Sequence, residues 1–249
     1  MEQSRKKFLK HFLIGATTVP LIMEACKKDT ITTTDGTTTT TTTTTGTTTG
    51  SCTVTPSETA GPFPTITPSS LVRSDIRLDR TGVALTIKIT ITNKNSSCAA
   101  LSGALVDIWH CDKDGLYSEY GGTSMQTTDY TAVHFLRGRQ TTDTNGLVTF
   151  TSIFPGWYQS RATHIHVHIY NAAGTSLLVT QIAFPEASDS AVVTVNASTA
   201  NGYTKGMTGY TYNAADSVFT DDTTGAEIAT VTGSIAAGYV LAKTINVAA

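Results

Sequence analysis

The chain has 249 residues, of which 39% are hydrophobic, enough to build the core of one large domain or two small ones. Its 17 basic and 19 acidic residues give a formal net charge of −2. Without the six basic and two acidic residues before position 29, 11 basic and 17 acidic residues remain, a net charge of −6. An acidic domain without a basic stripe argues against nucleic acid as a partner.

Residues 1–25 have the order of an export signal. A basic opening at 4–10 precedes a mostly apolar stretch at 12–23, which is too short to span a membrane as a helix. Cys26 follows an alanine directly, which resembles a bacterial lipoprotein signal in which Cys26 becomes the lipidated first residue. The opening also resembles a twin-arginine signal, except that Lys6 stands at the second arginine, so both export routes stay open. The sequence therefore predicts an exported, membrane-anchored lipoprotein on the periplasmic side or the cell surface.

Residues 26–51 are rich in threonine, with nine consecutive threonines at 37–45. Such a composition cannot bury enough apolar area to offset the chain entropy that folding removes. We therefore expect a disordered tether at 26–51, followed by one folded domain at 52–249.

Three cysteines remain for the folded domain: Cys52, Cys98 and Cys111. In an exported protein they allow at most one disulfide within the chain, and one thiol is left over. Pairing of Cys98 with Cys111 and pairing of Cys52 with Cys98 are both possible.

The folded domain is predicted to be mainly β. Residues 83–92 alternate aliphatic side chains with threonine and lysine, which is the period of a half-buried strand. No ten-residue segment has a helical apolar face, and the Gly, Thr, Asn and Asp-rich region 199–232 is expected to form long loops. Runs of β-branched residues predict further strands at 104–110, 147–153, 163–170, 176–184, 191–196 and 235–247.

Turn sequences separate these runs. The segment 93–95 ends the first strand, and Asp143-Thr144-Asn145-Gly146 carries the Asn-Gly signal of a tight hairpin. Many short strands with turns at this spacing predict an antiparallel β-sandwich or barrel.

Three alternate histidines, His164, His166 and His168, lie in the predicted strand 163–170. Alternate side chains share one face of a strand at intervals of about 6.6 Å, so two imidazoles can converge on one ion. Zinc and cupin-type sites also use a His-x-His pair but need a third histidine or a carboxylate, whereas here the nearby oxygen donor is the phenol of Tyr158. A phenolate suits hard ferric iron better than zinc. The pattern predicts a ferric site, with His168 as a rim or packing residue.

Three segments extend this pattern. They are Asp107-Ile108-Trp109-His110-Cys111-Asp112 with Gly115-Leu116-Tyr117-Ser118, then 135–143 with Asn145-Gly146 and Phe150, and then Pro155-Gly156-Trp157-Tyr158 with Arg161 and His164-Ile165-His166. Together they resemble the intradiol ring-cleavage dioxygenases, the ferric enzymes of the protocatechuate and catechol dioxygenase type. The resemblance covers about residues 56–247, is most specific from 105 to 183, and implies a β-sandwich core with long loops.

The resemblance implies four protein ligands for one mononuclear, non-haem Fe(III): Tyr117, Tyr158, His164 and His166. Tyr120, three residues after Tyr117, is a rival ligand, but the Gly-x-Tyr pattern favours Tyr117.

The resemblance also implies catalytic roles for Arg161, Tyr158 and Gln181. Arg161 would stabilise negative charge that develops on the substrate ring during oxygen attack. Tyr158 would leave the metal and take a proton when the substrate binds. Gln181 would line the substrate pocket. The segment 59–64 departs from the familiar enzymes, which often carry a glutamate and a tyrosine there.

The function that the resemblance implies is cleavage of a catechol ring between its two hydroxyl-bearing carbons with O2, giving a muconate-type diacid. The expected partners are a catecholic small molecule, O2 and, through the lipid anchor, a membrane, whereas the oligomeric state is left open. The alternative function is a lipid-tethered β-sandwich binding module that keeps the fold and the metal without turnover.

Overall fold

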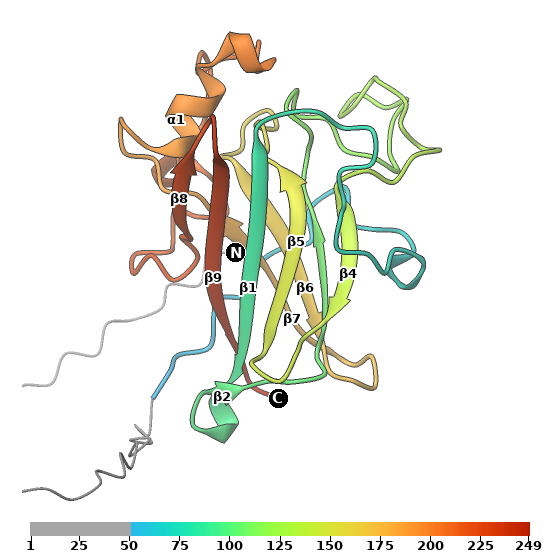
Figure 1. Cartoon of the computed structure of the whole chain (residues 1–249), viewed down its shortest axis with the longest axis vertical. Helices are drawn as coiled ribbons and strands as arrows, with labels where there is room; N and C mark the ends of the chain where they lie inside the picture. Colours follow the sequence, from blue (N-terminus) through green and yellow to red (C-terminus); the bar gives the residue numbers. More distant parts are fainter. Residues whose placement is uncertain (1–50) are drawn as a thin grey trace, which may run out of the picture. The chain divides into compact units, whose positions relative to one another are not determined.

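Two β-sheets pack face to face in residues 51–249, the part of the chain that the computed structural model describes (Figure 1). The expected export signal at 1–25, the lipidation site Cys26 and the expected tether up to residue 50 lie outside the described residues. Among residues 51–249, no helix combines the length and the apolar character that crossing a membrane requires.

The first sheet is built around β1, Ala84–Asn93, which confirms the strand predicted at 83–92. Its aliphatic side chains alternate as expected, and Leu85, Ile87, Ile89 and Ile91 are buried. The strand order is β2-β1-β9-β8, and β5 also pairs with β1. The β1–β9 pair is parallel, so the sheet is mixed. Its other strands are β2 (Ala99–Ala100), β5 (Leu147–Ile153), β8 (Thr230–Ser234) and β9 (Gly238–Val247).

The second sheet is antiparallel and has the order β4-β3-β6-β7. In Figure 1 its strands β6 and β7 pass behind β5, and β4 lies to the right of β5. It consists of β3 (Leu105–Trp109), β4 (Arg137–Thr141), β6 (His164–Tyr170) and β7 (Ser176–Ala183). The expected mainly β sandwich with long loops is thus confirmed, with one parallel pair added to it.

The core between the sheets sets the direction of the histidines. Ile165, Val167 and Ile169 of β6 are fully buried in it, and each such side chain contributes about 1.5–3 kcal/mol of transfer free energy. Because side chains alternate along a strand, His164 and His166 lie on the opposite face of the same sheet. A register slip by one residue would exchange the two sets, so the aliphatic residues keep the imidazoles outside the core.

The strand predicted at 191–196 is wrong, because Ala191–Asn196 forms the helix α1. The Ser190 side chain caps this helix by accepting the backbone N–H of Val193. Val192 and Val195 are buried at a spacing of three residues, so packing and capping outweigh the strand preference of valine. Within residues 51–249, four single 3₁₀ turns complete the helical elements: Pro68–Ser70, Lys94–Ser96, Thr199–Asn201 and Asn213–Ala215.

One strand boundary differs from the prediction, and the strands β4 and β8 were not predicted. The run predicted at 235–247 begins as a strand only at 238. It pairs with the unpredicted strand β8 at 230–234, which overlaps the end of the expected loop region 199–232. Strand β4 was not predicted, because Arg-Gly-Arg-Gln-Thr has neither alternation nor β-branched enrichment.

The predicted hairpin at Asp143–Gly146 is a tight turn that connects the two sheets. The Asp143 carboxylate accepts the N–H groups of Asn145 and Leu147, at 2.8 and 2.9 Å. The turn joins β4 to β5, which belong to different sheets, so the hairpin prediction is wrong. Gly146 has φ +71°, and a Cβ there would lie 2.4 Å from the Ile91 carbonyl oxygen, so only glycine fits.

One disulfide joins Cys52 to Cys98, with their Cα atoms 5.9 Å apart, and Cys111 is a buried free thiol. This resolves the two pairings that the sequence left open. The bond links the beginning of the domain to the turn after β1 across a sequence separation of 46. Closing a loop of this length stabilises the fold by about 4 kcal/mol in the chain-entropy description.

Candidate metal centre

Three of the expected ligand atoms converge on the outer face of β6. The His164 Nε2 atom lies 3.1 Å from the Tyr117 Oη atom and 3.1 Å from the His166 Nε2 atom. Neighbouring donors around an ion with bonds of about 2.0–2.1 Å are separated by about 3 Å. The three side chains are at most 2% exposed. The spacing and the one-oxygen, two-nitrogen donor set therefore fit a ferric ion.

The His164 imidazole is held in the tautomer that a metal ligand needs. Its Nδ1 lies 2.6 Å from the Ala162 carbonyl oxygen, so Nδ1–H donates and Nε2 keeps its lone pair. Burial, together with the positive charge of Arg161, lowers the pKa of His164 to about 3. The ring is neutral at physiological pH and is able to ligate.

The His166 imidazole is oriented by packing. It stacks on the Trp109 indole with an interplanar angle of 1° and a centroid distance of 4.9 Å. The Gly61 backbone packs on it so closely that a Cβ would lie 3.0 Å from the His166 Cε1 atom. Burial holds the pKa of His166 well below its usual range. Its Nδ1 is buried without a hydrogen-bond partner among residues 51–249, so aromatic packing replaces the usual anchoring hydrogen bond.

The Tyr117 phenol is placed by the loop that follows β3. The Gln126 amide bonds both the N–H and the carbonyl of Tyr117, each at 2.7 Å. The ring stacks on Phe63 with centroids 4.8 Å apart. Burial raises the pKa of Tyr117 well above its usual value, so its phenolate form needs a cation beside it.

Arg137 joins the two segments that carry these aromatic rings. Its buried guanidinium donates to the carbonyl oxygens of Phe63, at 2.9 Å, and Ser118, at 2.5 Å. A third bond goes to the Ser118 hydroxyl at 2.8 Å. No local sequence pattern points to a role for Gln126, and Arg137 stands out in the sequence only because it lies within the family-like segment 135–143.

Tyr158 lies beside the three converging donors, but its hydroxyl points elsewhere. Its ring centroid is 6.0 Å from that of Tyr117. Its hydroxyl donates to the Met125 carbonyl at 3.1 Å, and the side chain is only half-buried. The structure therefore brings together three of the four expected ligands and places the fourth at the solvent-facing side.

Arg161 and Gln181 form a fixed pair next to the histidines. The Arg161 Nε atom lies 3.0 and 2.9 Å from the two carboxylate oxygens of Asp216, and its Nη2 donates to the Gln181 Oε1 atom at 2.7 Å. Gln181 in turn donates to the Thr59 carbonyl at 2.8 Å and lies opposite His166 in the β6–β7 register. Both residues therefore lie beside the histidine strand.

Asp216 is a residue of the site that sequence reasoning missed. It is fully buried and also accepts the N–H groups of Ala162, at 2.6 Å, and Val218, at 2.8 Å. It follows Arg161 by 55 positions, in a region predicted as loop, and no local pattern points to it.

Two residues weighed as alternatives lie outside the cluster. The Tyr120 hydroxyl donates to the Pro64 carbonyl at 2.6 Å. The two ring nitrogens of His168 pair with the hydroxyls of Ser176 and Tyr170, each at 2.8 Å. These hydrogen bonds hold the polar atoms of Tyr120 and His168 away from the converging donors.

Comparisons with known proteins bear on the family and the fold of this chain. A model of the dioxygenase family matches residues 64–216. The intradiol ring-cleavage dioxygenase from Tetranychus urticae is 28% identical, with a TM-score of 0.68 over 79% of this chain and 95% of that protein. The dioxygenase domain of a dioxygenase carbohydrate-binding protein fusion from Streptomyces sp. SirexAA-E is 25% identical, with a TM-score of 0.56 over 79% of this chain and 99% of that domain.

A more distant structure shares the fold. Hydroxyquinol 1,2-dioxygenase from Pseudomonas putida DLL-E4 is 16% identical, with a TM-score of 0.52 over 79% of this chain and 67% of that protein. A search of curated proteins found no match. The extent of the family match, together with the β-sandwich fold, shows that this chain belongs to the intradiol ring-cleavage dioxygenase family.

Proposed function

We propose that this protein is a non-haem Fe(III) dioxygenase that cleaves a catecholic ring between its two hydroxyl-bearing carbons with O2 and releases a muconate-type diacid. The observation that carries the proposal is the convergence of the Tyr117 phenol with the Nε2 atoms of His164 and His166, at 3.1 Å separations. Catechol-type ring cleavage is the reaction that the family fold supports in general.

Iron is the cofactor that this donor set would hold. Intradiol dioxygenases in general depend on Fe(III), and a phenol paired with imidazoles is a suitable set for that hard ion. When bound, Fe(III) would act as a Lewis acid toward the catechol oxygens and make the ring reactive toward O2. Tyr117, His164 and His166 would hold it from the buried side, which leaves the half-buried side next to Tyr158 for the substrate.

Tyr158 is the residue that we assign to proton transfer. Its hydroxyl already donates to the Met125 carbonyl, a position that suits the protonated phenol after it has left the metal. Burial raises the pKa of Tyr158 above its usual value, which favours the protonated form when no cation is bound to it. A phenolate at this position would take a proton from an incoming catechol and return to the Met125 carbonyl.

Arg161 supplies a fixed positive charge beside the ligand cluster. Asp216 and Gln181 bond its guanidinium from two directions, so it needs little reorganisation when charge develops on the substrate. A preorganised donor of this kind typically contributes about 10²–10³-fold to a rate. A binding module has no need of such a group, so Arg161 favours the catalytic function over the alternative.

The reaction is proposed to take place outside the reducing cytoplasm. The disulfide between Cys52 and Cys98 supports an oxidising compartment. The signal-like residues 1–25 and Cys26 support export and anchoring through a lipid.

The experiment combines colour with oxygen uptake. Iron-loaded protein should absorb in the visible region through phenolate-to-ferric charge transfer, and it should consume one O2 for each catechol opened in a panel of substituted catechols. A colourless protein that retains no iron would overturn the metal assignment. A coloured protein that consumes no O2 with any catechol would favour the tethered binding module.

A further inference from the structure

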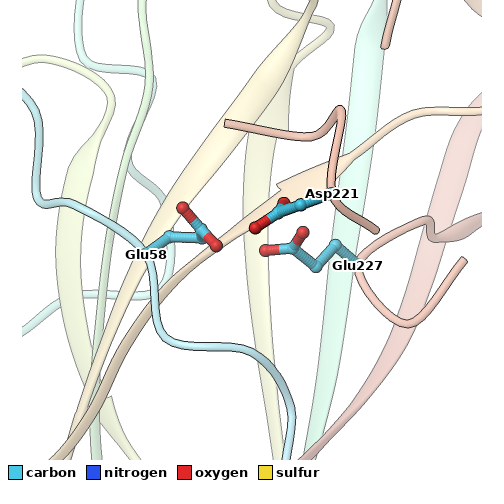
Figure 2. A group of neighbouring side chains, drawn as sticks. All are labelled: Glu58, Asp221 and Glu227. Atoms are coloured by element: carbon cyan, nitrogen blue, oxygen red, sulfur yellow. The ribbon is translucent and has the colours of Figure 1, made fainter. Parts of the chain in front are cut away.

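A cluster of three carboxylates, separate from the converging phenol and imidazoles, has the residue types that can hold a metal ion. Glu58, Asp221 and Glu227 each offer a carboxylate oxygen, and these oxygens lie within 4.8 Å of one another. Figure 2 shows the three carboxylates turned toward a common point. Glu58 belongs to the segment before the first strand, whereas Asp221 and Glu227 belong to the loop before β8.

Glu227 is the member of this cluster that lacks a partner. Its side chain is fully buried, and neither of its carboxylate oxygens has a hydrogen-bond partner within the described residues 51–249. The ammonium group of Lys243 bonds the carbonyl oxygens of Ala226, at 2.5 Å, and Ile228, at 3.0 Å, and forms no ion pair with Glu227. A buried carboxylate normally has a hydrogen-bonding or charged partner, because removing it from water is costly.

The surroundings add negative charge. Burial, followed by the repulsion of Glu58, Asp222 and Asp221, raises the pKa of Glu227 to about 8, and the positive charge of Lys243 offsets this only in part. Without a cation, the cluster must therefore keep a proton or accept the repulsion. A bound cation would remove both costs.

We propose that Glu58, Asp221 and Glu227 bind a Ca²⁺ ion. The donors are all hard carboxylate oxygens, which suit Ca²⁺ or Mg²⁺ and not the softer transition metals. Three carboxylates that lie within 4.8 Å of one another can share one ion, and Ca²⁺ accepts several carboxylates in a flexible shell, whereas Mg²⁺ is usually bound through only one or two. Asp221 is exposed and Glu58 is half-buried, so water can complete the shell on that side.

The position of the cluster gives the ion a structural effect on the candidate active site. Thr59, next to Glu58, holds the Gln181 amide through its carbonyl oxygen. Phe219, two residues before Asp221, lies under the Arg161 guanidinium, with 5.7 Å between the Arg161 Cζ atom and the ring centroid. An ion shared by the two segments would clamp them together and hold Arg161 and Gln181 in place.

Thermal unfolding with and without calcium tests the proposal on the full chain. Protein dialysed against a chelator is compared with the same protein in excess CaCl2 or MgCl2. At about one hundred times the dissociation constant, Ca²⁺ should raise the unfolding midpoint by about 5 °C or more, and Mg²⁺ should have a smaller effect. Isothermal titration with CaCl2 should give one binding event per chain.

Glu227→Gln separates ion binding from simple packing, since it keeps the shape and removes the charge. This variant should lose the calcium-dependent shift, yet in chelator it should be about as stable as the native chain, because without a cation Glu227 keeps a proton below about pH 8 and is neutral as well. Asp189→Asn, a change to an exposed acidic residue outside the cluster, should keep the full shift. If Glu227→Gln does not fold, Glu58→Gln at the half-buried position should also lose the shift.

A native chain that does not respond to CaCl2 would overturn the proposal, as would an equal response in Glu227→Gln. An equal response to Mg²⁺ would overturn the choice of ion. The ferric absorption band bears only on Tyr117, His164 and His166, so failure of the calcium site and failure of the iron site give different results.

Discussion

The Arg161 guanidinium and the Asp216 carboxylate form a close ion pair in which Nε contacts both oxygens, at 3.0 and 2.9 Å. Asp216 is completely buried and also accepts two backbone N–H groups. The pair fixes the direction of a cation that borders the histidine cluster. Its removal should therefore affect the reaction more than the binding of iron.

The first prediction concerns Asp216→Asn. This substitution keeps the shape of the side chain and removes the charge that orients Arg161, so we expect kcat to fall about 10²-fold while the ferric absorption band is retained. Oxygen uptake with the best catechol and the visible spectrum provide the two measurements. Unchanged kcat would contradict the assigned role of the pair.

The second prediction compares two tyrosines three residues apart. Tyr117→Phe removes the buried phenol that lies 3.1 Å from the His164 Nε2 atom, so the protein should lose its bound iron and its visible absorption. Tyr120→Phe removes a hydroxyl that bonds only the Pro64 carbonyl, so most of the iron should remain. Iron is measured by mass spectrometry of the purified variants. Comparable iron retention in both would show that Tyr117 is not a ligand.

The third prediction compares two histidines on the same face of β6. His164→Ala removes a converging nitrogen and should abolish iron retention, whereas His168→Ala should leave most of it, because His168 bonds Ser176 and Tyr170 instead. Circular dichroism establishes that both variants are folded. Loss of iron in His168→Ala alone would place the metal at the other end of the strand.

The fourth prediction concerns acid unfolding. Burial lowers the pKa of His110 to about 4, so the unfolded chain binds more protons than the folded one between about pH 6.5 and pH 4. The contribution of His110 to the free energy of unfolding should therefore be fully present above pH 6.5. It should fall as the pH drops toward 4, by about 3 kcal/mol in total.

Urea unfolding at pH 7 and at pH 4.5 measures this effect. His110→Gln should be less stable than the native chain at pH 7, because the bonds to Ser152 and the Cys111 carbonyl are disturbed, but it should lose less stability on acidification. Equal losses in the two proteins would mean that His110 is not responsible for the pH dependence.

Local patterns in the sequence predicted the β architecture and most of the candidate site. The alternation at 83–92 correctly predicted β1, because side chains of a strand point alternately to its two faces. The same geometry placed His164 and His166 on one face, opposite the aliphatic residues of β6. Tyr117, Arg161 and Gln181 followed from the resemblance of short segments to a known family, and the structure places all three beside these histidines.

Other features depend on contacts between residues that are distant in the sequence, and the periodicity of the sequence does not predict such contacts. The choice of Cys98 as the partner of Cys52, the helix in place of a strand at 191–196, and the bonding of Arg161 to Asp216 were all set by tertiary packing. The acidic cluster joins Glu58 to Glu227 across most of the domain. The alternation of a strand is visible within a few consecutive residues. The partner of a buried charge can come from any segment of the chain, and only the tertiary fold decides which segment lies next to it.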